Sequence, residues 1–318
     1  MTMLSIIRRL YVRTFGLDRI PLKLDDPDLL HGQAASDSIA HCIKSGQPAM
    51  IARFGSIELD CLNQIRIQRG GVLQKYITYI KGQRETIGLS PEIMSKMENN
   101  TGFFPADIEH LDRFYDTMME DIKQLDILGS WLYRENFFEN ELKEVKRIKR
   151  FDMEPYFHRE PWSRELVGKR VLVVHPFATS IRKQYAKRDK LFANPEVLPT
   201  FELITYRPVQ SIAGNYDKLP FKSWFEALHS MKADISAIDF DVAILGCGAY
   251  GFPLAAHIKR MGKQSIHLGG ATQILFGIIG RRWETEYNMS PYVNEHWIRP
   301  GEDERPDNFD KIEGGCYW

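Results

Sequence analysis

Hydrophobic and polar positions change their spacing about halfway along the chain. Beyond residue 168, short apolar runs alternate with longer amphipathic stretches. This pattern predicts strands at 170–175, 201–207, 240–245 and 264–268, with helices at about 179–190, 222–236 and 252–261 between them. Because strands that alternate with helices are typical of a mostly parallel sheet, we predict a Rossmann-like α/β fold with helices flanking the sheet.

The first half of the chain is predicted to be rich in helices. An apolar run at 49–54 ends at Gly55 and predicts one strand, followed by a helix over about 57–68. Ser90 and Pro91 are typical of the N-cap and first residue of a second helix. A third helix is expected after residue 105, because apolar residues recur there at spacings of three and four. Its predicted buried stripe consists of Ile108, Leu111, Tyr115, Met118, Ile122 and Leu125.

A stretch of prolines, aromatic residues and charges at about 152–170 marks a junction between the two halves. We therefore expect four segments. They are a helical N-terminal segment over 1–45, a strand and helix-rich part over 46–155, an α/β nucleotide-binding half over 156–283 and a tail over 284–318. The tail is rich in aromatic residues, including Tyr317 and Trp318. They are expected to pack back over the sheet as a cover, or else to stack on the pyranose rings of a sugar.

Composition excludes several classes of protein. The 318 residues suffice for two domains or one large α/β domain, and 43% hydrophobic with 26% charged residues is close to the globular average. Because 42 Lys and Arg balance 42 Asp and Glu, a global basic field for holding nucleic acid is not expected. The four cysteines lack paired spacing, so we expect reduced thiols and a cytoplasmic protein. No apolar run approaches the roughly 18 residues of a membrane span.

The N-terminal fifteen residues mix apolar side chains with Arg8, Arg9 and Arg13, and they lack the cleavage site of a signal peptide. Two interpretations stay open. The segment is either a short helix docked on its own domain or a helix that rests on an anionic membrane surface, which would place the protein peripherally at the inner membrane face.

Three predicted strand ends carry unusual residues, and in an open parallel sheet ligands bind outside the carboxyl ends of the strands. The first reads Arg-Phe-Gly-Ser-Ile-Glu over 53–58, with Glu58 in the first turn of the predicted helix. Glu58 is a candidate metal ligand, general base or ribose acceptor. It would equally complement the helix dipole or pair with Arg53.

The second strand end is Gly-Cys-Gly-Ala-Tyr-Gly over 246–251, a G-x-G-x-x-G sequence just before a predicted helix. Its glycines let backbone amides approach a phosphate. A dinucleotide-binding fold also needs an acidic residue roughly 20 positions later, where this chain has His267 and two glycines instead. The motif therefore favours phosphate over NAD, although a plain tight turn would use the same glycines.

The third strand end begins at His175 and leads into a predicted helix that carries Ser180, Arg182 and Lys183. Hydroxyls at a helix N-terminus followed by basic side chains can neutralise a diphosphate. The loop after the last strand adds free amides at another helix start, with Gly269, Gly270 and Gln273. Together these strand ends predict a site for phosphates or sugar hydroxyls.

These residues resemble bacterial glycosyltransferases of the GT-D fold, which act in cell-surface polysaccharide and glycoprotein assembly. Residues 51–58 are similar to that family's arginine-aromatic-glycine segment with its Asp-x-Glu pair, and 99–105 looks like its Asn/Gly-aromatic-Pro loop. The resemblance implies a Rossmann-like fold and a hexosyltransferase-like enzyme. Such an enzyme moves a sugar from a nucleotide-diphosphate donor, most simply a UDP-sugar, to a glycan acceptor.

The chain departs from the family pattern at Ser56, which stands where the family has aspartate. The resemblance implies Mn²⁺ or Mg²⁺ near that pair, but a single carboxylate with a hydroxyl is a poor site for a hard cation. Glu58 is left as catalytic base or remaining metal ligand, and Arg182 and Lys183 are expected to replace the cation. The expected substrate-binding residues are Arg53, Gly55, Ser56, His175, Ser180, Arg182, Lys183, Gly246, Gly248, Tyr250, Gly251, Gly269, Gly270 and Gln273.

Two other classes of function stay open. One is a non-catalytic protein that binds a sugar nucleotide or a glycan, in which Ser56 marks lost chemistry. The other is an NAD(P)-dependent oxidoreductase that uses the glycine motif, and the missing acidic residue disfavours it.

Overall fold

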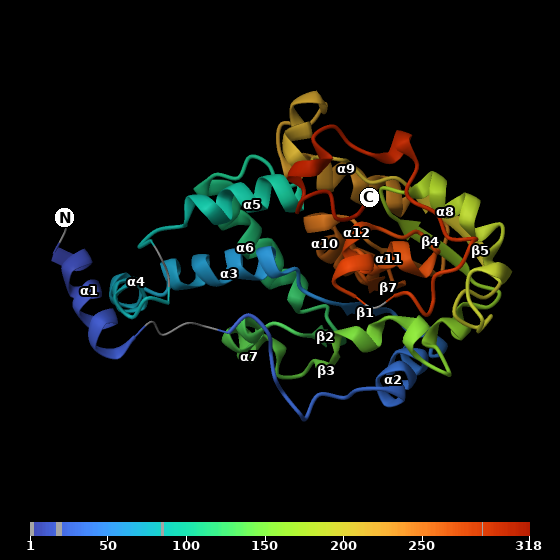
Figure 1. The fold of residues 1–318 in the computed structure, drawn as a ribbon, viewed down its shortest axis with the longest axis horizontal. Coiled ribbons are helices and arrows are strands. Elements are labelled where there is room, and N and C mark those ends of the chain that lie inside the picture. The colour runs from blue at the N-terminus through green and yellow to red at the C-terminus, as the bar shows by residue number, and fades with distance from the viewer. Residues whose placement is uncertain (1–2, 17–20, 84–85, 288) are drawn as a thin grey trace.

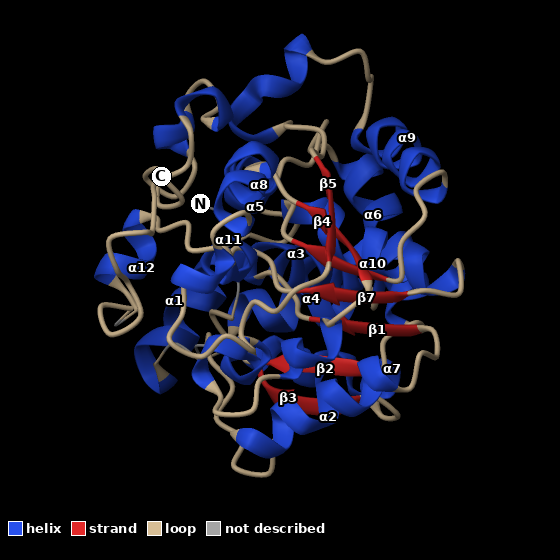
Figure 2. Cartoon of the chain, turned by 90° about the vertical axis from the view of Figure 1, so that its right-hand side faces the viewer, coloured by secondary structure: helices blue, strands red, loops and turns tan. Residues whose placement is uncertain are grey.

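The structure, a computed structural model, describes residues 3–16, 21–83, 86–287 and 289–318. In this part of the chain seven strands form one sheet in the order β3-β2-β1-β7-β6-β4-β5, and neighbouring strands are parallel (Figure 2). The predicted α/β class with a mostly parallel sheet is therefore confirmed. The strands are β1 (Ala49–Ala52), β2 (Ile127–Ser130), β3 (Lys146–Lys149), β4 (Arg170–Val174), β5 (Glu202–Tyr206), β6 (Val242–Leu245) and β7 (Gln264–His267).

Helices cover both faces of the sheet. Successive strand residues point to opposite faces, so Met50 and Ala52 join the core of one layer while Ile51 joins the other. The first layer holds α3 (Ser56–Arg69), α5 (Pro91–Thr101), α6 (Ile108–Ile122), α9 (Trp224–Ser236) and α10 (Gly251–Arg260). The second holds α2 (Gln33–Lys44), α8 (Ala178–Tyr185) and α11 (Ala271–Leu275).

The helices predicted in the first half form with the expected caps. The Ser90 hydroxyl accepts a hydrogen bond from the Ile93 amide at 3.1 Å and starts α5. The side chain of Asp107 caps α6 in the same way. Four residues of the predicted stripe are buried, Tyr115 is partly buried, and Ile108, the first residue of α6, is 58% exposed.

The first half contains two strands more than predicted. Strand β2 has four residues, and β3 is a charged edge strand in which Ile148 alone is buried. Segments this short carry no readable alternation. Strands from both halves share one sheet, with β1 beside β7, so the core is continuous across the predicted junction. The division into four segments stays a prediction.

The remaining helices lie outside these layers or are short. Helix α8 ends at Tyr185, and residues 188–190 form a separate 3₁₀ turn where one helix had been predicted to continue. Helices α1 (Met3–Phe15) and α4 (Val72–Ile80) pack together at one end of the molecule (Figure 1). Two short helices complete the set, α7 (Glu139–Leu142) and α12 (Arg281–Thr285).

In the described ranges, no helix has the length and apolar character needed to cross a bilayer. The four cysteines are free thiols.

Candidate functional site

A cavity of about 740 Å³ opens at the carboxyl ends of four neighbouring strands. Strand β1 leads into Arg53, β7 ends at His267, β6 leads into Gly246 and β4 into His175, and all four residues line the cavity. The chain leads from β4 to β5 in one direction along the sheet and from β6 to β7 in the other, so the topological switch point lies between β4 and β6. Because ligands of open parallel sheets bind at such a point, this cavity is the candidate site.

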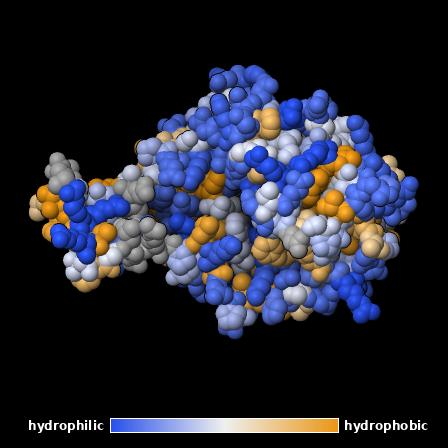
Figure 3. All heavy atoms as spheres, in the orientation of Figure 1, coloured by the Kyte–Doolittle hydropathy of each residue, from blue (hydrophilic) through white to orange (hydrophobic). Residues whose placement is uncertain are grey.

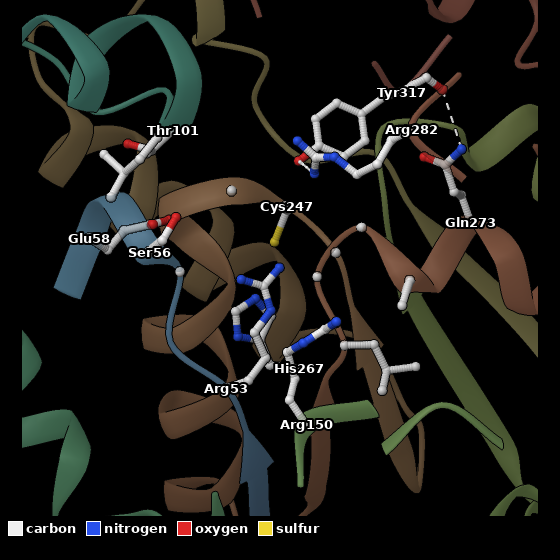
Figure 4. A pocket seen from close by; sticks show the side chains of 18 of the residues that line it. Arg53, Ser56, Glu58, Thr101, Arg150, Cys247, His267, Gln273, Arg282 and Tyr317 are labelled. Atoms are coloured by element: carbon white, nitrogen blue, oxygen red, sulfur yellow. Dashed lines mark hydrogen bonds between the residues drawn. The ribbon is translucent and has the colours of Figure 1, made fainter. Parts of the chain in front are cut away.

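Most of the predicted site residues meet in this cavity. Figure 4 shows Arg53 pointing into the space between Glu58 on one side and Arg282 on the other. The structure therefore brings distant strand ends and loops to one place, although the roles of the residues stay predictions. The predicted residues that line the cavity are Arg53, Gly55, Ser56, Glu58, His175, Gly246, Gly248, Tyr250, Gly269, Gly270 and Gln273.

The structure does not bring Ser180, Arg182 and Lys183 into the cavity lining. The carboxylate of Glu304 accepts hydrogen bonds from the amides of Thr179 at 2.7 Å and Ser180 at 3.1 Å, and it also contacts the Ser180 hydroxyl. The N-terminus of α8 is thus neutralised by the protein's own carboxylate. Arg182 and Lys183 are exposed on the helix surface.

Gly251 also lies outside the cavity lining, and its role is packing. A Cβ atom at this position would collide with the imidazole of His267. The missing side chain lets the start of α10 approach the end of β7 closely. This glycine of the motif therefore shapes the site through His267 and contributes no cavity surface of its own.

Three arginines line the cavity, and they come from different parts of the chain. Arg150 follows β3 and forms an ion pair with Glu154 at 3.0 Å. Arg282, in α12, pairs with the carboxylate of Glu313. The guanidinium of Arg53 donates to a backbone carbonyl at 3.3 Å. Three guanidinium groups thus reach the cavity, and two of them are paired with carboxylates of the protein.

The environment of Arg53 favours a bound anion. Burial is the main cause that lowers the pKa of Arg53; Glu58 opposes it, and the charges of Arg150 and Arg282 lower the pKa further. Buried like charges repel in a medium of low dielectric constant. An anionic group between the three guanidinium groups would relieve that repulsion and form charge-assisted hydrogen bonds.

Several buried polar atoms on the cavity lining lack a hydrogen-bond partner among the described residues. Leaving such an atom unpaired costs about 1–3 kcal/mol. Each of these atoms is itself buried, so a ligand in the cavity pairs with it only if the side chain shifts. These atoms are Arg53 Nε, Arg150 Nε, His267 Nδ1, Gln273 Oε1 and Trp318 Nε1.

Glu58 lies in the first turn of α3, beside Ser56 on the cavity wall. Its carboxylate folds back toward Gly55, at a place that any Cβ on residue 55 would occupy. Burial raises the pKa of Glu58, against the opposing effects of its own backbone N–H and of Arg53. A carboxylate with a raised pKa in a cavity is suited to accept a proton from a substrate.

Two buried histidines face the cavity as neutral groups. Burial lowers the pKa of His175 to about 3, and burial with repulsion from Arg53 lowers that of His267 to about 3. The Nδ1 atom of His175 accepts a hydrogen bond from the Phe177 amide at 3.0 Å, so its proton is on Nε2. Both rings can hydrogen-bond a ligand without adding charge.

The residues around Glu58 do not fit a resident divalent cation. Within the described ranges, no group of three or more His, Cys, Asp or Glu side chains could hold a metal ion. Ser56 adds one hydroxyl to the carboxylate of Glu58, whereas hard cations take several oxygen ligands from the protein. Positive charge at this site comes from arginines.

The cavity is also lined by Arg150 and Arg282, which the strand-end motifs do not indicate, and by Tyr317 of the aromatic tail. The Arg282 guanidinium donates to the Tyr317 hydroxyl at 3.0 Å, and the Gln273 side chain donates to the Tyr317 carbonyl at 3.2 Å (Figure 4). The last residues of the tail form one wall of the cavity, and whether their rings stack on a sugar stays a prediction. Its run of aromatic residues was the available signal.

No family model and no curated protein matches the sequence. Among solved structures, the chain is similar to a selenomethionine-substituted domain of unknown function, DUF1792. The two are 12% identical with a TM-score of 0.43, and the match covers 98% of this chain and 94% of that one. The fold assignment rests on the sheet and helices described above.

Proposed function

We propose that this protein is a glycosyltransferase that moves a sugar from a nucleotide-diphosphate donor to a hydroxyl of a glycan acceptor. The observation that carries the proposal is the joint position of Arg53 and Glu58 on one cavity at the carboxyl end of β1. An anion-binding group and a candidate base thus lie on the same wall. The resemblance of residues 51–58 to GT-D glycosyltransferases supports the same reading, with a role in cell-surface polysaccharide or glycoprotein synthesis.

The proposed reaction gives Glu58 and the arginines separate tasks. The acceptor oxygen attacks the anomeric carbon of the donor sugar, and Glu58 takes the proton from that hydroxyl. The bond between the anomeric carbon and the phosphate oxygen breaks, and the diphosphate leaves with the electron pair. Arg53, together with Arg150 and Arg282, stabilises the negative charge that develops there.

The glycine loops complete the proposed donor site. Gly248 follows β6 and Gly270 follows β7, and we propose that their backbone amides contact the diphosphate. The amides of Gly246 and Gly269 donate instead to the carbonyls of Val174 at 2.9 Å and Leu245 at 3.0 Å. We propose a UDP-sugar as the donor. Because three arginines reach the cavity and Ser56 stands where the family motif has its second carboxylate, we propose that transfer needs no resident Mn²⁺ or Mg²⁺.

Replacing Glu58 with glutamine tests the proposal. Release of UDP from UDP-sugars in the presence of glycan acceptors should fall by about 10²–10⁴-fold, while binding of UDP is retained. Glu109→Gln is the matched control, because Glu109 is an exposed glutamate in the first turn of α6 and lies outside the cavity. It should leave turnover unchanged.

The outcome separates the three functional classes. Unchanged turnover in Glu58→Gln would remove Glu58 from the mechanism. Binding of nucleoside diphosphates without turnover on any acceptor would favour a non-catalytic binding protein. Thermal stabilisation by NAD or NADP, with none by UDP, would favour an oxidoreductase.

A further inference from the structure

The helix pair of α1 and α4 projects from one end of the molecule, away from the sheet (Figure 1). The Arg8 guanidinium lies over the Tyr79 ring at 4.6 Å and ties the two helices together. None of the described residues of α1 is buried. A helix that packs on its own domain normally buries an apolar stripe, so this arrangement needs another explanation.

An apolar stripe runs along the exposed side of α1. Met3 is 77% exposed and Leu10 is 59% exposed, and Ile6 and Ile7 lie between them on the same face. On α4, Leu73 at 73% and Ile77 are also exposed, one turn apart. Contiguous apolar side chains at the surface mark an interaction site. Figure 3 shows hydrophobic atoms intermixed with strongly hydrophilic ones at this end of the molecule.

The charges of the two helices have one sign. Helix α1 carries Arg8, Arg9 and Arg13, helix α4 carries Lys75, and neither helix contains Asp or Glu. On the helical wheel Arg9 and Arg13 flank the apolar stripe on one side. Since the whole chain has zero net charge, this is a local concentration of positive charge.

We propose that α1 and α4 dock on an anionic membrane surface, with the apolar stripe in the boundary between headgroups and acyl chains. A helix needs about 20 residues to span a bilayer, and α1 has 13. It would therefore lie in the plane of the membrane interface. The basic residues favour an anionic membrane over a second copy of the chain, because a symmetric contact between two copies would bring like charges together. The proposal is independent of the glycosyltransferase proposal.

Co-sedimentation of the full chain with lipid vesicles tests this docking. We expect binding to vesicles that contain phosphatidylglycerol, weak binding to pure phosphatidylcholine vesicles, and loss of binding at high salt. Replacing Arg9 and Arg13 together with glutamine should weaken binding about 25-fold, at roughly fivefold per basic residue. Leu10→Ser should weaken it as well.

Matched control variants show whether a loss of vesicle binding is specific to α1 and α4. Ile108→Ser removes an equally exposed apolar side chain from α6, and replacing Lys190 and Lys222 with glutamine removes two exposed charges elsewhere. Neither control should change vesicle binding. Equal binding of all variants, or no binding to anionic vesicles, would overturn the proposal. So would self-association of the chain that Leu10→Ser abolishes in the absence of lipid.

Discussion

The guanidinium group of Arg53 occupies the space in which a Cβ atom on residue 269 would lie. Arg53 follows β1 and Gly269 lies two residues beyond β7, and these strands are parallel neighbours. Gly269 has a φ of +65°, which is the left-handed region that glycine adopts most easily. One glycine therefore shapes the loop and leaves room for the arginine.

Replacing Gly269 with alanine should displace Arg53 and remove binding of nucleoside diphosphate. The left-handed backbone alone costs an alanine about 1–2 kcal/mol of stability. Gly262→Ala is the matched control, because Gly262 has a φ of +82° with nothing within 4 Å of the added Cβ. Gly262→Ala should show the backbone cost alone, and Gly269→Ala should lose at least as much stability in thermal unfolding. Gly269→Ala alone should lose its stabilisation by UDP. Equal stabilisation of both by UDP would contradict the role of Arg53.

The raised pKa of Glu58 predicts how stability depends on pH. In the folded state burial raises this pKa above its ordinary value of 4.5, so the folded protein holds a proton that the unfolded chain has released. Stability from this group is present below pH 4.5 and is lost as pH rises through the folded pKa. Glu58→Gln cannot ionise. Its stability relative to the wild type should therefore improve between acid and neutral pH in urea unfolding.

Asp116→Asn is the control for this pH dependence, since it should behave in the opposite way. The hydrogen bond from Arg69 lowers the pKa of Asp116, so its contribution is present above the ordinary pKa of 3.8 and is lost as pH falls. The variant should thus lose relative stability toward neutral pH, by a small amount because the pair is exposed. If Glu58→Gln also loses relative stability toward neutral pH, the effect of Arg53 on the pKa of Glu58 outweighs that of burial.

The sequence predicts the strand ends because their signals are local. The apolar run before Arg53 and the glycines after β6 each lie within a few consecutive residues, and parallel topology then places them on one edge. The two arginines that face these strand ends have no such local signal. Arg150 follows β3, where a single buried isoleucine leaves no periodic pattern, and Arg282 reaches the cavity through contacts with the tail.

The predicted site residues of α8 lie outside the cavity for a related reason. Its N-terminal residues were read as an open anion site, and the carboxylate that fills that site belongs to Glu304, about 125 positions later in the chain. Sequence spacing gives no indication of such a contact. The helix dipole was correctly expected to attract a negative charge, but the source of that charge is the protein itself.

The position of Arg182 and Lys183 outside the cavity predicts that they do not bind the donor. Replacing both with alanine should change UDP affinity by less than about twofold, whereas Arg282→Ala should weaken it about tenfold or more, as for a lost charge-assisted hydrogen bond. Isothermal titration calorimetry measures both. A large loss in the double variant with none in Arg282→Ala would return the diphosphate to the N-terminus of α8.

Ser56 offers a direct test of whether arginine has replaced a metal at this site. Ser56→Asp places a second carboxylate beside Glu58 and restores the Asp-x-Glu pattern, so UDP should stabilise this variant more with Mn²⁺ than with EDTA. Ser56→Asn, of similar size and without charge, should show no such difference. Wild-type protein should respond equally to UDP in Mn²⁺ and in EDTA, because its positive charge comes from Arg53, Arg150 and Arg282. If wild-type binding of UDP requires Mn²⁺, the charge of these arginines is insufficient and the single carboxylate of Glu58 does hold a cation.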